Sequence, residues 1–206
     1  MSRAILLAHG SPDPRSSAAV RSAATAIAAR TGTTVAAAYL DHDQPRLADV
    51  VDDGSVVLPL LLSTAYHAKV DVPAAVAAVA SDVRLLDPLG HPAAVLDARL
   101  RRATSPAVVV AAGTRDDTER AAFADAVAAS AWRTGVRAVA AYATGPGPRL
   151  ADVVGPGDGC VVPWLLAPGR LLDGVLGAAD EAGLEVEGGA LLDEPLLLDE
   201  VARRLA

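Results

Sequence analysis

Short apolar runs alternate with longer amphipathic segments along the whole chain. Between the apolar runs, polar residues return at helical spacing, for example over residues 15–30. Runs that are apolar throughout are typical of strands in parallel sheets that helices cover on both faces. The pattern therefore predicts a βαβα order and an α/β fold. The expected strands lie at residues 4–8, 34–39, 56–61, 83–86, 107–111, 136–141, 159–165 and 184–187.

The chain repeats itself. The sequence PRLADVV occupies residues 45–51 and recurs unchanged at residues 148–154, which is 103 residues later. The same shift aligns AILLAHGS at residues 4–11 with AVVVAAGT at residues 107–114. A match of this length in the same order is not expected by chance, so the chain consists of two tandem copies of one unit.

The repeat also predicts the domain organisation. We expect an α/β domain over residues 1–104 and a second one over residues 105–206, each with a mainly parallel four-stranded sheet flanked by helices. In open sheets of this kind ligands bind beyond the carboxyl ends of the strands. The residues that follow each strand are therefore where a functional site is expected.

Composition narrows the classes of protein. The chain has 206 residues, of which 52% are hydrophobic and 3% aromatic, and it carries a net charge of −7. This length and apolar content support an aliphatic core and exclude a disordered chain. The negative charge argues against nucleic acid as the main partner, since phosphate binding needs a clustered basic surface.

The hydrophobic stretches do not predict a membrane protein. The longest uncharged stretch, residues 54–68, contains Pro59 and His67 and is shorter than the ~18 apolar residues of a membrane span. Residues 1–8 lack the long apolar region and cleavage site of a signal peptide, so we expect a cytoplasmic protein. The single cysteine, Cys160, excludes an internal disulfide or a cysteine-based zinc cluster, and we expect it in the core of a strand.

Three strand ends of the first copy carry candidate functional residues. His9 follows the first strand, Asp41 the second and His67 the third. Two imidazoles and a carboxylate at one edge of a sheet can bind Fe²⁺, Co²⁺, Ni²⁺ or Zn²⁺, or can act as paired acid and base groups. A histidine after a strand is also commonly a capping or packing residue, and an aspartate in a loop is commonly a turn residue.

The neighbouring residues have simpler interpretations. We expect His42 to be exposed beside Asp41, and His91 to be mainly structural because it precedes Pro92 at a helix entry. Ser11 and Pro12 predict an N-cap followed by a proline at the first helical position.

The second copy lacks these candidate residues. Ala112 replaces His9, Thr144 replaces Asp41, and the segment that aligns with residues 64–67 reads PGRL at residues 168–171. The loss favours a single site that is built on the first copy and covered by the second, with a ligand cleft between them. The chain contains no Walker A loop, no G-x-S-x-G and no G-x-G-x-x-G after a strand.

Two histidine-bearing segments carry a resemblance to a known family. They read LLAHGSPDP at residues 6–14 and LPLLLSTAYHAKVDVP at residues 58–73. Together with DPLGHP at residues 87–92, they resemble the sirohydrochlorin chelatases of the CbiX and SirB type. LAPGR at residues 166–170 is similar to the degenerate second half of the family's two-copy form. The resemblance extends over essentially the whole chain.

The resemblance implies a class II, ATP-independent chelatase with a chelatase-like fold. Such an enzyme inserts Fe²⁺ or Co²⁺ into sirohydrochlorin for sirohaem or cobalamin synthesis. His9 and His67 match the family's metal-binding and catalytic histidines, and Asp41, four residues before Pro45, stands where related chelatases often have a glutamate. The divalent metal, Fe²⁺, Co²⁺ or Ni²⁺, is then a substrate, and no tightly bound cofactor is expected.

Substrate binding is expected in the same two segments and in the matching loop of the second copy. Sirohydrochlorin carries many carboxylates, so basic residues near the histidines are its expected partners. A non-catalytic carrier of metal or tetrapyrrole remains the alternative function, and because two copies can complete one cleft, a monomer is expected. The expected substrate-binding residues are Gly10, Ser11, Arg15, Tyr66, Lys69 and Arg170.

Overall fold

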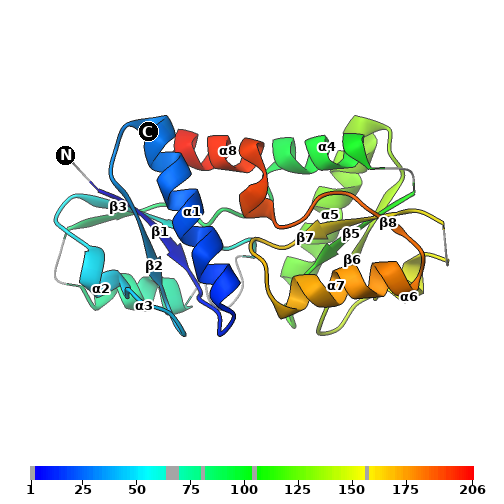
Figure 1. The fold of residues 1–206 in the computed structure, drawn as a ribbon, viewed down its shortest axis with the longest axis horizontal. Coiled ribbons are helices and arrows are strands. Elements are labelled where there is room, and N and C mark those ends of the chain that lie inside the picture. Colours follow the sequence, from blue (N-terminus) through cyan, green and yellow to red (C-terminus); the bar gives the residue numbers. More distant parts are fainter. Residues whose placement is uncertain (1–2, 64–69, 80–81, 104–105, 156–157) are drawn as a thin grey trace. The chain divides into compact units, whose positions relative to one another are not determined.

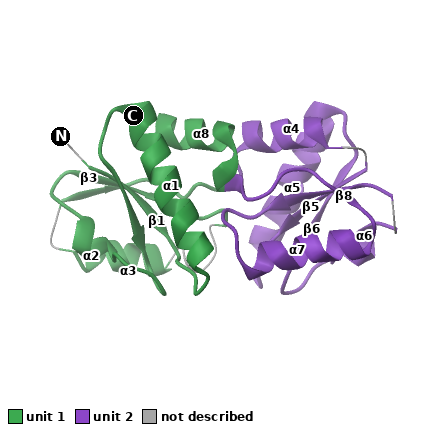
Figure 2. Ribbon diagram, in the orientation of Figure 1, with its two compact units in different colours: residues 1–90, 192–206 green, residues 91–191 purple. Residues whose placement is uncertain are grey.

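The computed structural model describes residues 3–63, 70–79, 82–103, 106–155 and 158–206 (Figure 1). Its contacts divide the chain into two compact units, which Figure 2 shows in different colours. Unit 1 comprises residues 1–90 and 192–206, and unit 2 comprises residues 91–191.

Unit 1 holds a sheet of four parallel strands in the order β2-β1-β3-β4. The strands are β1 (Ala4–Ala8), β2 (Val35–Tyr39), β3 (Ser55–Pro59) and β4 (Val83–Leu85). The helices of this unit are α1 (Pro14–Thr31), α2 (Leu47–Val50), α3 (Val72–Ala77) and α8 (Pro195–Leu205).

Unit 2 repeats this sheet, with four parallel strands in the order β6-β5-β7-β8. The strands are β5 (Ala107–Ala111), β6 (Ala138–Tyr142), β7 (Cys160–Trp164) and β8 (Glu185–Val186). The helices are α4 (Ala93–Arg102), α5 (Asp117–Thr134), α6 (Leu150–Val153) and α7 (Arg170–Glu181), and a 3₁₀ turn, η2 (Leu191–Asp193), precedes α8. The predicted α/β fold with two parallel four-stranded sheets is thus confirmed.

The central strands form because their sequences are apolar on both faces. All five residues of β1 are buried, and β7 is buried along its whole length. Cys160 lies in β7 and is buried, as predicted. Strands β4 and β8, which lie at one edge of each sheet, are shorter than the predicted runs and carry exposed residues.

Helix α1 begins later than predicted. Its N-cap is Asp13, whose side chain accepts a hydrogen bond from the Arg15 amide, and Pro14 occupies the first helical position. The prediction that Ser11 and Pro12 begin the helix is therefore wrong, because a second residue pair of the same type follows two positions later. The Ser11 hydroxyl instead accepts from the Asp13 amide and shapes the approach to the helix.

The fourth helix of each sequence copy belongs to the other unit. Helix α4 follows the first copy's last strand, yet it packs against α5 in unit 2, while α8 packs against α1 in unit 1. In unit 2, the Asp97 carboxylate on α4 accepts from Ser130 at 2.6 Å and pairs with Arg133 at 2.7 Å. In unit 1, Arg30 and Asp199 form an ion pair at 2.8 Å. The compact units therefore do not follow the boundary expected between residues 104 and 105.

The structure also bears on membrane association. Among the described residues, no helix combines the length and the apolar character that crossing a membrane requires.

Candidate functional site

The ends of three neighbouring strands lie at one edge of the sheet in unit 1. Strand β1 lies between β2 and β3, and all three run in parallel, so their carboxyl ends share an edge. His9 follows β1, and Asp41 follows β2 by two residues. The segment after β3 is described as far as Ser63. Of the predicted site residues, Tyr66, His67 and Lys69 lie outside the described residues.

Gly10 allows the segments after β1 and β2 to approach closely. Its φ is +93°, and a Cβ at this position would lie 1.8 Å from the Asp41 carbonyl oxygen. The Asp41 amide donates to the His9 carbonyl at 2.7 Å, and the Ser11 amide donates to the Asp43 carboxylate at 3.1 Å. Only glycine fits at the point where the segments after β1 and β2 cross, and this crossing holds His9 and Asp41 on adjacent segments.

His9 has an imidazole neighbour that the sequence did not lead us to expect. The rings of His9 and His42 are 6.1 Å apart between centroids and are inclined by 29°. His9 Nδ1 also lies 3.3 Å from the Gly10 carbonyl oxygen. His42 is exposed, as predicted, but it lies beside His9 as well as beside Asp41. One signal for this in the sequence is that Gly145 aligns with His42 under the repeat.

Asp41 is an ionised carboxylate with several partners. The hydrogen bond from the His42 amide to Asp41 Oδ1, at 2.8 Å, is the main cause that lowers the pKa of Asp41 below its usual value. The nearby His42 ring and the Arg46 guanidinium, 3.5 Å and 3.6 Å away, lower it further. Asp41 therefore contributes negative charge to this edge of the sheet.

Arg15, expected to bind substrate, has a carboxylate partner within its own helix turn. Its Nη2 lies 2.6 Å from Asp13 Oδ2, and its Nε donates to Asp13 Oδ1 at 3.0 Å. The Arg15 side chain is about half exposed, at 52%. A substrate carboxylate at Arg15 would therefore compete with Asp13.

Unit 2 repeats the backbone of this site without its imidazoles. Gly113 has a φ of +104°, and a Cβ there would lie 2.0 Å from the Thr144 carbonyl oxygen, as at the equivalent Gly10. The Thr144 amide and hydroxyl both donate to the Ala112 carbonyl, at 2.8 and 2.7 Å. Both copies thus keep the crossing of the two segments, while Ala112 and Thr144 replace the ionisable side chains.

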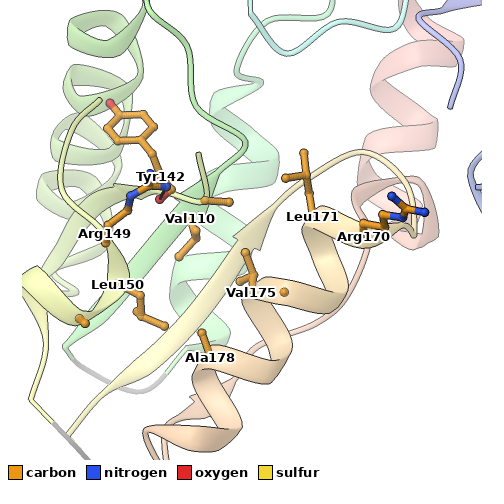
Figure 3. A pocket seen from close by; sticks show the side chains of 11 residues that line it. Val110, Tyr142, Arg149, Leu150, Arg170, Leu171, Val175 and Ala178 are labelled. Atoms are coloured by element: carbon orange, nitrogen blue, oxygen red, sulfur yellow. Dashed lines mark hydrogen bonds between the residues drawn. The ribbon is translucent and has the colours of Figure 1, made fainter. Parts of the chain in front are cut away.

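A pocket lies at the carboxyl ends of β5 and β6 in unit 2 (Figure 3). Its volume is about 310 Å³. Its walls are mostly apolar and come from both strands and from α6 and α7, including Val110, Leu150 and Val175. Arg149 and Arg170 also line it, and Arg170, which the sequence predicts to bind substrate, is the first residue of α7.

His91 lies in an aromatic cluster of unit 2. Its Nδ1 accepts a hydrogen bond from Trp164 Nε1 at 3.0 Å, and its ring centroid is 5.0 Å from that of Phe123. Burial is the main cause that lowers the pKa of His91, which Glu119 partly offsets. These contacts agree with the structural role expected for His91.

The described residues do not on their own form a complete metal site. Among them, no group of three or more histidine, cysteine, aspartate or glutamate side chains is arranged to hold an ion. The roles of His9, Asp41 and the substrate-binding residues therefore stay predictions.

Comparisons with known proteins identify the family and the fold. Residues 3–105 match the sequence model of the CbiX family. No curated protein matches the chain. The solved structure of CbiX, described as the terminal enzyme for the biosynthesis of siroheme in denitrifying bacteria, aligns with a TM-score of 0.75 and 20% identity, over 100% of this chain and 98% of that one.

A second solved structure shares the fold. It is a multi-domain protein from Deinococcus radiodurans with structural similarity to chelatases, and it aligns with a TM-score of 0.72 and 21% identity. The alignment covers 100% of this chain but 54% of the Deinococcus protein, so the present chain spans about half of that relative. The two structures support the fold, and the sequence match over residues 3–105 shows that the chain belongs to the CbiX family.

Proposed function

We propose that this protein is a class II, ATP-independent chelatase that inserts Fe²⁺ or Co²⁺ into sirohydrochlorin, in sirohaem or cobalamin biosynthesis. Membership of the CbiX family supports chelatase activity. The observation that carries the proposal is the position of His9, at the carboxyl end of β1 within the matched half, where the second copy has Ala112. A purely structural histidine would not need to differ between two copies that keep the same strand and the same glycine-mediated approach of the two segments.

The chemistry of metal insertion suits imidazoles. The metal must exchange water ligands for the four nitrogens of the macrocycle, and two pyrrole N–H protons must leave. Neutral imidazole binds Fe²⁺, Co²⁺ and Ni²⁺, and with an ordinary pKa near 6.5 it also accepts protons at neutral pH. We assign metal binding and proton acceptance to His9 and His67, with Asp41 as the acidic residue beside them.

Binding of the macrocycle is proposed to use both copies. The substrate's carboxylates would pair with Arg15, Lys69 and Arg170, and Gly10, Ser11 and Tyr66 would contact it near the metal. The pocket beside Arg170 and Arg149 offers an apolar wall next to two guanidinium groups, which suits an apolar ring with acidic arms.

The test is an absorbance assay of the full chain with sirohydrochlorin and either Co²⁺ or Fe²⁺, the latter without oxygen. We expect a rate above that without protein, and His9→Ala is expected to reduce it to that background while keeping the circular dichroism of the parent. Full activity in His9→Ala would refute the assignment of His9. Tight binding of sirohydrochlorin without acceleration would favour the alternative, a carrier of metal or tetrapyrrole.

Arg170→Ala tests the substrate contact in the same assay. We expect the KM for sirohydrochlorin to rise about two- to fivefold at unchanged kcat, the effect of losing an exposed ion pair of up to about 1 kcal/mol. Arg137→Ala is the matched control, because Arg137 is exposed just before β6 and so lies at the opposite end of that strand from the pocket. Equal KM values for the two variants would remove Arg170 from the substrate site.

A further inference from the structure

His42 has an unusual backbone conformation. Its φ is +62°, and among the residues that the structure describes it is the one non-glycine residue with positive φ. A side chain in this left-handed region is disfavoured because its Cβ crowds the backbone. Histidine adopts this region more often than most non-glycine residues, so the conformation becomes informative only together with what surrounds the side chain.

The internal repeat supplies a direct comparison for this position. Gly145 aligns with His42, and its φ is +71°, so both copies use the same backbone conformation. The second copy has glycine there, the residue that adopts this conformation without steric cost. It also has Ala112 where the first copy has His9. The two imidazoles that lie together in unit 1 are thus both absent from the equivalent place in unit 2.

Asp41 lies beside both the backbone amide and the ring of His42. The Asp41 carboxylate accepts from the His42 amide at 2.8 Å, and Asp41 Oδ2 lies 3.5 Å from His42 Nε2. A carboxylate beside one ring nitrogen favours a proton on that nitrogen and leaves the other with its lone pair, as in many metal-binding histidines. Arg46 lies 3.6 Å from the same carboxylate on its other oxygen, Oδ1.

The distance between the two rings lies within the limit for a shared ion, and a tetrahedral ion would draw their centres together to about 5.3 Å, a movement of under about 1 Å. Two imidazoles that each bind one divalent ion at about 2.0–2.1 Å have ring centres at most roughly 6.5 Å apart. The centroids of His9 and His42 are 6.1 Å apart. Because His42 is exposed while His9 is partly buried, an ion held between them would meet His42 on the solvent side.

We propose that His42 and His9 form a two-imidazole site that takes up the divalent metal substrate from solution, with Asp41 as the residue that positions the His42 ring. The inference rests on the proposed chelatase function, and it adds a residue to the metal site. Two protein ligands leave the other coordination positions of the ion to water, which suits a metal that must afterwards pass to the macrocycle. Imidazole nitrogen is a suitable ligand for Fe²⁺, Co²⁺ and Ni²⁺ alike.

Binding of Co²⁺ alone tests the site without any tetrapyrrole. Isothermal titration calorimetry of the full chain is compared for the parent, His9→Ala, His42→Asn and His42→Gly. Asparagine tolerates the left-handed conformation, and glycine reproduces the residue of the second copy, so both variants remove the imidazole without disturbing the loop. We expect both to weaken Co²⁺ binding by at least about tenfold, since losing even a supporting residue lowers metal affinity 10- to 100-fold.

A second measurement reports on the two rings directly. In imidazole ¹H–¹⁵N spectra of the parent, substoichiometric Co²⁺ is expected to broaden the signals of His9 and His42 together. Ala112→His combined with Gly145→His rebuilds the pair in the second copy and is expected to add a second Co²⁺ site, whereas Ala112→His alone is not.

The outcomes separate this inference from the proposed function. Co²⁺ affinity unchanged in His42→Asn and His42→Gly would overturn the role of His42, even if metal insertion into sirohydrochlorin proceeds. Conversely, loss of Co²⁺ binding in these variants would support the site even if the parent does not accelerate metal insertion, and in that case only the chelatase proposal fails.

Discussion

Two arginines of α4 share one carboxylate and differ in burial, so they allow a controlled test of what holds this helix in unit 2. Arg99 is 1% exposed, and its guanidinium binds the Glu187 carboxylate and, at 2.6 Å, the Glu187 carbonyl oxygen. It also donates to the Gly189 carbonyl at 3.3 Å. Arg102 binds the same carboxylate at 2.7 Å, but its side chain is 47% exposed.

Substitution of each arginine by methionine keeps most of the apolar stem and removes the charge. Removing one partner of a buried ion pair costs about 3–5 kcal/mol, because the other charge is left without compensation. In Arg99→Met the Glu187 carboxylate keeps Arg102, so we expect the lower end, about 3 kcal/mol. For Arg102→Met we expect at most about 1 kcal/mol, as for other exposed pairs.

Thermal unfolding followed by circular dichroism measures the difference. For a chain of this size 1 kcal/mol corresponds to about 2–4 °C, so Arg99→Met should lower the Tm by about 6–12 °C and Arg102→Met by less than about 4 °C. Equal shifts for the two variants, or a larger one for Arg102→Met, would refute the argument from burial.

Two further predictions concern the strand-end crossing and the aromatic cluster. Gly10→Ala should lower the free energy of unfolding by more than Gly32→Ala, for which about 1 kcal/mol is expected. Both glycines have positive φ, but a Cβ at Gly10 would lie 1.8 Å from the Asp41 carbonyl oxygen, whereas a Cβ at Gly32 would meet open space. Equal Tm values for the two variants would contradict this. Burial lowers the pKa of His91 from 6.5 in the folded state, so the unfolded chain binds more protons and stability should fall as the pH drops below about 6.5. His91→Asn, whose Oδ1 takes the place of Nδ1 as the acceptor for Trp164, should lose that part of the pH dependence. The same change in Tm between pH 7.5 and 5.5 in the parent and in His91→Asn would contradict this prediction.

The sequence predicted the sheets well because their signal is local. Strands such as β1 and β5 are apolar throughout, and the internal repeat aligns one with the other by sequence alone. The start of α1 was misplaced because Ser11-Pro12 and Asp13-Pro14 present the same capping chemistry two residues apart. Local rules could not rank the two pairs, since the choice depends on the segment after β2, which holds the Ser11 amide through Asp43.

The candidate site was predicted in part. The strand-end positions of His9 and Asp41 follow from the order of parallel strands, which the alternation of strands and helices already favoured. The contact between His9 and His42 depends on a left-handed residue, and the sequence indicates that conformation only indirectly, through Gly145, the glycine that aligns with His42. The assignment of α4 and α8 to units was also out of reach, because both helices follow equivalent strands and the repeat cannot tell which sheet each will cover.

Because α4 and α8 each pack in the unit of the other sequence copy, the two units can be completed only in a fixed order during synthesis. Unit 2 is one continuous stretch, residues 91–191, so all of its parts have been made before α8 leaves the ribosome. Synthesis of unit 1 begins first but ends last, because α8, which packs against α1, is the last helix of the described chain to be made. The half that carries His9 is therefore completed only after its partner copy exists, and a chain interrupted before α8 would leave the site on an unfinished scaffold.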